Sequence, residues 1–303
     1  MPIADIPGSY RPEVLPFVLQ ELETKGALGS AEMVAHNRQV MLRTNSHVPP
    51  GARLHLLAVG ISAYNEDYAK SLRLHYADRD ANDLASAIVN TQGSLYQVQP
   101  QRLLNKEATK SGILHALGVM RAGMAAGGGN DLAVVHFSGH GAMVDHKLYL
   151  LPDEVDARDD AGIKASALSA EDLKGELLEL ARYGRVLVLL DACHSGATTM
   201  DGTAIAVDAD ALRTGLAAAN VTVLTSSKGS ETSEERESWQ HGAFTKALLD
   251  SFNDPAADTN RNGLISTTGL ATYLNRRVPT LTDGKQTPGM EVRFDTTVFA
   301  VGQ

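Results

Sequence analysis

Four apolar runs of strand length, separated by segments with helical periodicity, constrain the fold of this chain more than any other feature. The runs are residues 54–61, 132–137, 186–190 and 221–224. Each is apolar at nearly every position, with His55, His136 and Thr222 as the polar exceptions, which is typical of strands buried on both faces. Strands that alternate with helices form a largely parallel sheet with helices on both faces. The sequence therefore predicts an α/β fold.

The helices that connect these strands are expected at 81–89, 111–124, 242–252 and 267–278, with another beginning at Ser169 as its N-cap. Residues 1–50 have weaker patterning. They contain one expected helix, 12–22, and end in Pro49-Pro50-Gly51, which interrupts regular structure. We therefore divide the chain into an N-terminal extension or linker, 1–50, and one domain, 51–303.

Composition excludes several classes of protein. The net charge of −9 over 303 residues argues against nucleic-acid binding and favours a cationic substrate. No apolar run approaches the roughly 20 residues of a membrane-spanning helix, so no membrane partner is expected. The single cysteine rules out an intrachain disulfide, and the first 20 residues lack a secretory signal. The expected location is the cytoplasm.

A candidate nucleophile and a candidate base follow two of the buried strands. Ser138-Gly139-His140-Gly141 follows the second run and Asp191-Ala192-Cys193-His194-Ser195-Gly196 the third, both interpreted as turns. Ligands of parallel sheets bind at the carboxyl ends of the strands. A thiol becomes a useful nucleophile when a nearby base raises its thiolate fraction. The sequence therefore predicts Cys193 as nucleophile and His140 as its acid–base partner.

Peptide hydrolysis also needs donors for the oxyanion, and the backbone N–H groups of Gly141 and Cys193 are the candidates. His194 is a less favoured base, because neighbouring side chains in extended backbone point in opposite directions. The alternative is structural, since single buried cysteines are commonly inert and histidines after strands are commonly ordinary polar residues. The pairing of the two at strand ends favours the catalytic interpretation.

The motifs His-Phe-Ser-Gly-His-Gly at 136–141 and Asp-Ala-Cys-His-Ser-Gly at 191–196 resemble the signatures of caspase-like cysteine peptidases. Within that group the chain is most similar to the bacterial metacaspases, or orthocaspases, from about residue 54 to about 294. Further similarity lies in Leu-Leu-Ala-Val-Gly at 56–60, Tyr-Ala-Asp-Arg-Asp-Ala at 76–81, Tyr-Leu-Leu-Pro at 149–152, Gly-Ala-Phe-Thr at 242–245 and Gln-Thr-Pro at 286–288.

This resemblance implies a caspase–haemoglobinase fold, a Cys–His dyad on a six-stranded sheet, and hydrolysis after Arg or Lys through an acyl-enzyme. It also implies an acidic specificity pocket formed by Asp80 and Asp191. Asp191 and Cys193 are two apart, which in extended backbone puts their side chains on one side. In the alternative, Asp80 caps its helix and Asp191 holds the turn through backbone N–H groups. Asp78 is the neighbour that could replace Asp80.

Ser226 and Ser227 match the part of the family that lines the cleft wall. The loop 228–241 that follows carries four glutamates and Trp239, which we interpret as a contact residue. This loop could cover the site or attract basic substrates, or it could be an ordinary solvated loop.

Many metacaspases require calcium, so calcium is a candidate activator although the chemistry needs no cofactor. Asp153, Asp156, Asp159 and Asp160 lie in the matching region and supply hard oxygen ligands, although such runs are commonly only solvated. A second stretch, 258–265, copies the first half of an EF-hand loop, but its twelfth position is Gly269. We interpret that stretch as a tight turn without calcium.

Caspase-like enzymes are often cut between a larger part, here to about 196, and a smaller part, about 220–303. Arg213 is the only basic residue between Cys193 and Lys228, so it is the candidate for self-cleavage in the loop 197–219. In the alternative, Arg213 lies on a short helix, 209–218, and the chain acts uncut.

Three other functions stay open. They are a same-clan peptidase directed at aspartate, a non-catalytic interaction module that keeps the fold, and a regulatory domain of a larger signalling protein. The resemblance to metacaspases favours a monomer that acts on protein or peptide substrates.

Overall fold

The computed structural model describes residues 48–65, 69, 72–193, 216, 220–227, 231, 233–292 and 295–302, so the expected helix 12–22 lies outside the described residues. The strands are β1 (Arg53–Gly60), β2 (Gln97–Leu104), β3 (Asp131–Val144), β4 (Lys147–Leu150), β5 (Leu168–Ser169), β6 (Gly184–Cys193), β7 (Val221–Thr225), β8 (Glu235–Arg236), β9 (His241–Gly242), β10 (Leu264–Ser266), β11 (Gly289–Glu291) and β12 (Thr297–Ala300). The helices are α4 (Ala77–Thr91), α5 (Lys110–Ala125), α6 (Asp160–Ser166), α7 (Ala170–Ala181), α9 (Ala243–Ser251) and α10 (Thr267–Leu281), with short 3-10 turns η3 (Asn105–Glu107) and η4 (Pro255–Ala257).

The main sheet has the strand order β11-β7-β6-β3-β1-β2. The neighbours from β7 to β2 are parallel, and only β11 is antiparallel to its partner β7. Strands β4 and β5 extend the sheet from β3. The predicted α/β fold with a largely parallel sheet is therefore confirmed; six strands form its main path, and β4 and β5 bring the whole sheet to eight.

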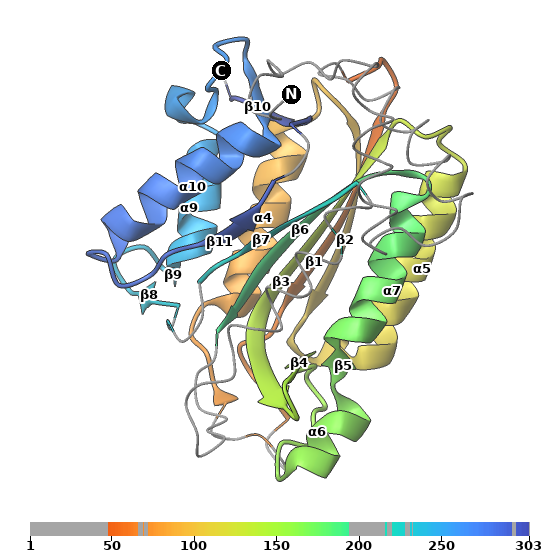
Figure 1. Ribbon diagram of the computed structural model, residues 1–303, viewed down its shortest axis with the longest axis vertical. Coiled ribbons are helices and arrows are strands. Elements are labelled where there is room, and N and C mark those ends of the chain that lie inside the picture. Colours follow the sequence, from red (N-terminus) through yellow and green to blue (C-terminus); the bar gives the residue numbers. More distant parts are fainter. Residues whose placement is uncertain are drawn as a thin grey trace, which may run out of the picture.

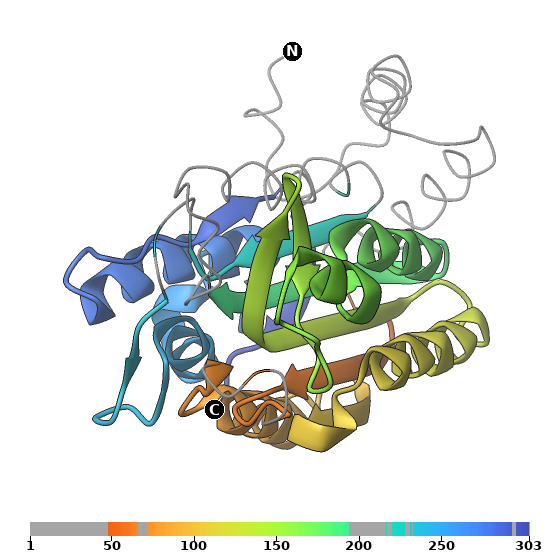
Figure 2. The ribbon, with the colours of Figure 1, turned by 90° about the horizontal axis from the view of Figure 1, so that it is seen from below.

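Helices cover both faces of the sheet. In Figure 1, α4, α9 and α10 lie on one face and α5 and α7 on the other, and the turned view of Figure 2 agrees. Alternate residues of each central strand divide between two buried clusters: Leu57 and Val59 pack beneath α5 and α7, whereas Leu56 and Ala58 pack beneath α4 and α9. The continuous apolar runs are explained by this burial on two sides.

Strand β3 corrects one prediction. The segment 138–141 is not a turn, because β3 runs on through Gly141 to Val144 and curves towards β4 (Figure 1). It stays paired with β6 as far as His140 and then pairs with β4 from Gly141 onwards. The change of partner supplies hydrogen bonds that the sequence pattern did not reveal.

Strand β2 was not predicted, because its sequence Gln-Val-Gln-Pro-Gln-Arg-Leu-Leu is mostly polar and partly exposed. It lies at the sheet edge, where one face and one row of backbone groups need no burial, and where Pro100 is tolerated.

Helix α10 continues past the expected end at residue 278 and contains Pro279. The expected N-cap is confirmed, since the Ser169 side chain accepts from the backbone N–H of Asp172.

Among the described residues, no helix is long and apolar enough to cross a membrane. Of the stretch 258–265, which was expected to be a tight turn, residues 258–263 form one, because Asp258 Oδ2 accepts from the Gly263 N–H at 2.7 Å and Gly263 has a φ of 80°, whereas residues 264 and 265 already belong to β10. A Cβ on Gly269 would lie 2.7 Å from the Ala257 carbonyl oxygen, so a larger residue could not enter there unless the backbone moved.

Asp131, at the start of β3, joins two strands at the amino end of the sheet. Its Oδ2 lies 2.9 Å from His55 Nε2 and 3.0 Å from an Arg53 guanidinium nitrogen, and its side chain is almost fully buried. Burial by itself raises the pKa of Asp131, but the bonds from His55 and Arg53 outweigh burial and hold the pKa below its ordinary value. The ionised carboxylate therefore stabilises the fold at neutral pH.

We expect Asp131→Ala to lower the free energy of unfolding by about 3 kcal/mol, because it leaves His55 and Arg53 without their buried partner. Urea unfolding at pH 7 measures this change. Since the folded-state pKa is lowered, the contribution is complete above the unfolded pKa of 3.8 and is lost as the pH falls through the folded-state value. Glu179→Ala removes an exposed pair with Arg182 and serves as control. Equal effects of the two variants would contradict the prediction.

Candidate active site

His140 and Cys193 lie opposite one another on adjacent strands. The register of β3 and β6 pairs their Cα positions at the carboxyl end of the sheet. Each residue follows a different apolar run, and the parallel pairing of the strands that contain those runs brings the two positions together. The structure therefore juxtaposes the two residues of the predicted dyad at the edge where parallel sheets bind ligands.

The His140 imidazole is buried and held by a backbone carbonyl. Its Nε2 lies 2.9 Å from the carbonyl oxygen of Leu72, in the segment between β1 and α4. A carbonyl oxygen can only accept, so Nε2 carries the proton and Nδ1 is the basic nitrogen of the neutral ring. This contact selects one tautomer, which a general base needs.

Tyr64 supports the same residue from a second direction. Its hydroxyl oxygen accepts from the His140 backbone N–H at 2.7 Å, and the two rings lie 5.4 Å apart between centroids. Gly139 permits this approach, because a Cβ there would lie 3.0 Å from the Tyr64 hydroxyl. Position 139 of the motif is therefore a glycine for a steric reason, since a larger residue would crowd the Tyr64 hydroxyl. Gly141, a predicted oxyanion donor, lies where β3 leaves β6 for β4.

Asp80 and Asp191 form a buried acidic pair beside these strand ends. Asp80 lies in the first turn of α4 with 1% of its surface exposed, and Asp191 lies on β6 with 4% exposed. A Cβ on Gly242 would lie 3.1 Å from Asp80 Oδ2 and 3.1 Å from Asp191 Oδ2. The two carboxylates therefore flank the same glycine at the start of α9.

Neither aspartate has the purely local role that was the alternative. Asp80 does not cap α4, since its Oδ1 lies 2.7 Å from His241 Nδ1 and its Oδ2 accepts from the Gly242 N–H at 3.1 Å. Asp191 Oδ2 accepts from Thr245 Oγ1 at 3.0 Å. Both carboxylates are thus held by β9 and α9, which are remote in sequence.

Burial dominates the electrostatics of this pair. It raises the pKa of Asp191 to about 6, although hydrogen bonds from Thr245 and Ser226 oppose the rise. Burial also raises the pKa of Asp80, and repulsion from Asp191 raises it further. The ionised forms are therefore costly without a cation nearby, as expected for two buried like charges.

Asp78, the alternative to Asp80, has different partners. It accepts from Ser62 Oγ at 2.6 Å and from Asn105 Nδ2 at 2.9 Å. Burial raises its pKa, but these bonds outweigh burial and leave the pKa below its ordinary value. Asp78 therefore ties the start of α4 to the ends of β1 and β2, and Asp80 is the residue beside Asp191.

Ser226, at the end of β7, is buried and accepts from Ser233 Oγ at 2.7 Å, whereas Ser227 is only partly buried. Glu235 in the following loop accepts from the backbone N–H groups of His75 and Tyr76 at 3.1 and 3.3 Å. The loop is thereby fastened to the start of α4. The Trp239 ring lies 4.8 Å from the Arg236 guanidinium carbon and packs partly against the core.

The four candidate calcium ligands do not converge. Asp156 binds Arg158, Asp159 caps α6, and Asp160 lies in the first turn of that helix. Asp153 is buried near Glu154, and burial followed by repulsion from Glu154 raises its pKa. In the described part of the chain, no three or more acidic, histidine or cysteine side chains form a group that could hold a metal ion. Calcium binding stays a prediction.

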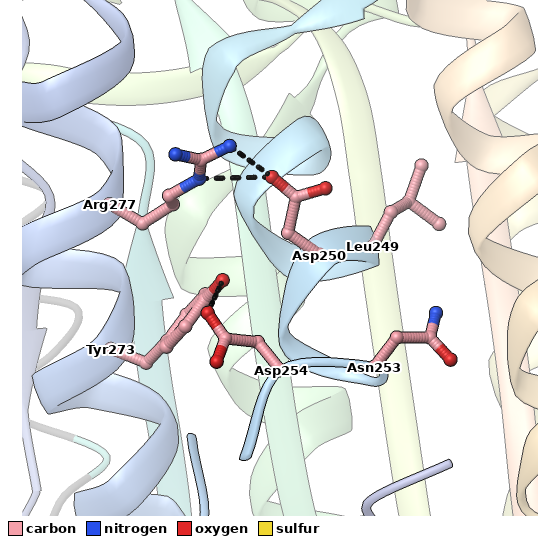
Figure 3. A pocket seen from close by; sticks show the side chains of 6 residues that line it. All are labelled: Leu249, Asp250, Asn253, Asp254, Tyr273 and Arg277. Atoms are coloured by element: carbon pink, nitrogen blue, oxygen red, sulfur yellow. Dashed lines mark hydrogen bonds and ion pairs between the residues drawn. The ribbon is translucent and has the colours of Figure 1, made fainter. Parts of the chain in front are cut away.

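Two further features lie apart from the dyad. Arg213, the candidate for self-cleavage, lies outside the described residues. A separate open cleft of about 510 Å³ between α9 and α10 is lined by Leu249, Asp250, Asn253, Asp254, Tyr273 and Arg277 (Figure 3). Its carboxylates already have partners, since Arg277 binds Asp250 and the Tyr273 hydroxyl donates to Asp254 (Figure 3).

Sequence reasoning missed several residues that hold the site, namely Tyr64, Leu72, His241 and Thr245. The Gly-Ala-Phe-Thr motif at 242–245 was part of the resemblance, but the residues themselves suggested no role for it. The motif did carry a sequence signal for this role. A glycine at the start of a helix can leave room for a buried carboxylate, and a threonine one turn further on can donate a hydrogen bond to it.

The structure places a cysteine and a histidine at facing positions of two neighbouring parallel strands, at the carboxyl end of a sheet that helices cover on both faces. A family model described as the caspase domain matches residues 54–299. The chain therefore belongs to the caspase-domain family of cysteine peptidases, whose substrates are proteins.

Solved structures agree on the fold. Protein GSU0716 from Geobacter sulfurreducens superposes with a TM-score of 0.54 at 20% identity, over 83% of this chain and 97% of that one. The Drosophila initiator caspase Dronc superposes with a TM-score of 0.54 at 11% identity, over 84% of this chain and 87% of that one. Among curated protein sequences, none matches this chain.

Proposed function

We propose that this chain is a cysteine endopeptidase of the metacaspase type that cleaves after arginine or lysine, with Cys193 and His140 as its dyad. The observation that carries the specificity is the pair of buried carboxylates, Asp80 and Asp191, on either side of Gly242. Two buried like charges are unfavourable in isolation and become favourable when one cation sits between them. A basic side chain of the substrate supplies that cation.

The reaction begins when the Cys193 thiol gives its proton to His140 Nδ1 and the thiolate attacks the scissile carbonyl carbon. The oxyanion accepts hydrogen bonds from the N–H groups of Gly141 and Cys193. As the C–N bond breaks, the leaving amine takes the proton from His140. A water molecule, deprotonated by His140, then attacks the acyl-enzyme, and the thiol is released with the new carboxylic acid. The contact of Nε2 with Leu72 keeps Nδ1 as the nitrogen that cycles its proton.

An aspartate-directed peptidase is the second candidate in the same clan. It requires a cation in the specificity pocket, and a carboxylate occupies position 191 instead. A non-catalytic module is the candidate from a different class. The register that pairs the positions of His140 and Cys193 favours catalysis over that alternative.

The test measures initial rates on matched fluorogenic peptides that end in arginine, lysine or aspartate, for wild type and Cys193→Ala. We expect cleavage after arginine or lysine that disappears in the variant. Cleavage after aspartate would overturn the pocket assignment and keep the dyad. Equal rates for wild type and variant would assign the activity to a contaminant. No cleavage of any peptide would favour the non-catalytic module.

Calcium is tested in the same assay as a separate hypothesis. We propose it as an activator only, with no part in the bond-breaking steps. Rates with added calcium and with a chelator should differ if the loop after β4 binds the ion, and identical rates would remove calcium from the proposal.

A further inference from the structure

The amino end of α9 is capped by residues from two other elements. Its N-cap is Gly242, which has no side chain to accept from the exposed N–H groups, and no acidic residue lies in its first turn. Asp80 on α4 accepts from the Gly242 N–H, and Asp191 on β6 accepts from the Thr245 hydroxyl. The positive end of a helix dipole thus faces the two carboxylates of the proposed pocket.

Thr245 is the only residue of α9 whose side chain bonds Asp191 in the described structure, at 3.0 Å between Oγ1 and Oδ2. Thr245 is fully buried, so its hydroxyl has no water to bond instead. A hydroxyl has one proton, and an ionised carboxylate can only accept. The Thr245 proton is therefore directed at Asp191 whenever Asp191 is ionised.

His136 lies behind Thr245 on β3. Its Nε2 is 3.5 Å from Thr245 Oγ1, its ring is fully buried, and its Nδ1 has no partner among the described residues. Burial lowers the pKa of His136 to about 3, so the ring is neutral. Since the Thr245 proton is directed at Asp191, the weak contact from His136 donates its Nε2–H to the threonine oxygen. His136 and Thr245 then form a chain of two donors that ends at Asp191.

The charged surroundings of Asp191 make such a chain useful. Asp80 and Glu235 face it with like charges, neutral His136 lies behind Thr245, and His241 bonds to Asp80 rather than to Asp191. None of these groups offers Asp191 a cation. The α9 terminus and the Thr245 hydroxyl are therefore among the few favourable contacts of the ionised form.

We propose that Thr245, backed by His136, is a positioning residue that holds the Asp191 carboxylate in place for the basic side chain of the substrate. This inference rests on the proposed function, since it assigns a role to Asp191 as a specificity group. Thr245 acts through Asp191 and takes no part in bond breaking. Loss of its hydroxyl should therefore weaken binding of the cation and leave the chemical step nearly intact.

The test compares Thr245→Val, which removes the hydroxyl at nearly constant shape, with Thr245→Ser, which keeps it. We expect Thr245→Val to raise KM for an arginine peptide about tenfold with kcat within about twofold of wild type, and Thr245→Ser to restore KM. The acid limb of kcat/KM should also move to higher pH in Thr245→Val, because Asp191 loses a donor to its ionised form. Thr267→Val is the matched control, since Thr267 is a buried threonine at the start of α10, remote in the sequence from the pocket.

A binding measurement separates this inference from the proposed reaction. Calorimetric titration of agmatine, a guanidinium probe, into Cys193→Ala with and without Thr245→Val reports on the pocket without turnover. Binding weakened about tenfold supports the positioning role even if no peptide is cleaved, in which case only the proposed reaction fails. Unchanged agmatine binding and unchanged KM would overturn the role of Thr245 while leaving the peptidase intact. An equal effect of Thr267→Val, or failure of serine to rescue, would also overturn it. If Thr245→Val does not fold, Thr245→Ala takes its place and the same comparison decides.

Discussion

Replacement of His140 by alanine is expected to lower kcat/KM for a basic peptide by about 10⁴-fold, because the thiol loses its base and the leaving amine loses its proton donor. The variant should keep the fold, since it loses the contact with the Leu72 carbonyl but leaves the apolar core on both faces of the sheet unchanged. His115→Ala on α5, where the histidine is exposed, is the control and should retain full activity.

The single cysteine allows a second readout of the same variant. Alkylation of this protein by iodoacetamide reports on Cys193 alone, because the sequence has no other thiol. In wild type, His140 should shift the pH dependence of alkylation below that of an ordinary thiol, whose pKa is about 8.5. In His140→Ala the profile should return to about 8.5. An alkylation profile that is the same in both proteins would rule out His140 as the partner and direct attention to His194.

Asp191→Asn is the prediction with the next largest effect. Asparagine has nearly the same shape and can still accept from the Thr245 hydroxyl, so the change mainly removes charge. We expect kcat/KM for arginine and lysine peptides to fall by about 10²- to 10³-fold, as when one partner of a buried charge pair is lost. Peptides with a neutral residue at the cleavage site should be hydrolysed at the wild-type rate. Asp78→Asn is the control and should keep the preference for basic over neutral peptides.

The pH dependence of stability provides an independent check on Asp191. Burial raises its pKa in the folded protein to about 6, above the ordinary value of 3.8. The stability contributed by the protonated carboxyl is therefore complete below pH 3.8 and is lost as the pH rises through about 6. The side chain of the Asp191→Asn variant does not ionise, so the variant does not lose stability as the pH rises through this range. The Tm of Asp191→Asn should exceed that of wild type at pH 7.5, and the difference should narrow towards pH 4. A constant difference across this range would contradict the assignment.

The raised pKa of Asp191 also predicts how activity depends on pH, and activity should change in the opposite direction to stability. Below about pH 6 the free enzyme carries a neutral Asp191, so a basic substrate gains less on binding, and kcat/KM should fall with decreasing pH. Asp80 shares the pocket, and the two carboxyls titrate as a pair rather than separately. The acid limb that Asp191 causes should therefore be absent for peptides with a neutral residue at the cleavage site, which retain only the pH dependence of the Cys–His dyad.

The central strands could be predicted because their sequences are dictated by burial on two faces. The runs that became β1, β3, β6 and β7 are apolar at nearly every position, as strands of a parallel sheet covered on both faces are. Edge strand β2 was missed, because a strand with one solvated side carries polar residues and even a proline. The continuation of β3 was missed for a related reason, since the backbone bonds of Gly141 to Val144 come from a hairpin with β4.

The sequence by itself determined the class of fold and the positions of the candidate nucleophile and base, because strand periodicity and strand ends are local properties. Only the tertiary structure decided what holds these groups. Leu72 reaches His140 across 68 residues, Thr245 reaches Asp191 across 54, and His241 reaches Asp80 across 161. Such contacts depend on which strands become neighbours in the sheet and where the connecting segments return. Short motifs therefore determine which reactive groups the site contains. The orientation and the electrostatics of those groups arise from packing between distant parts of the chain.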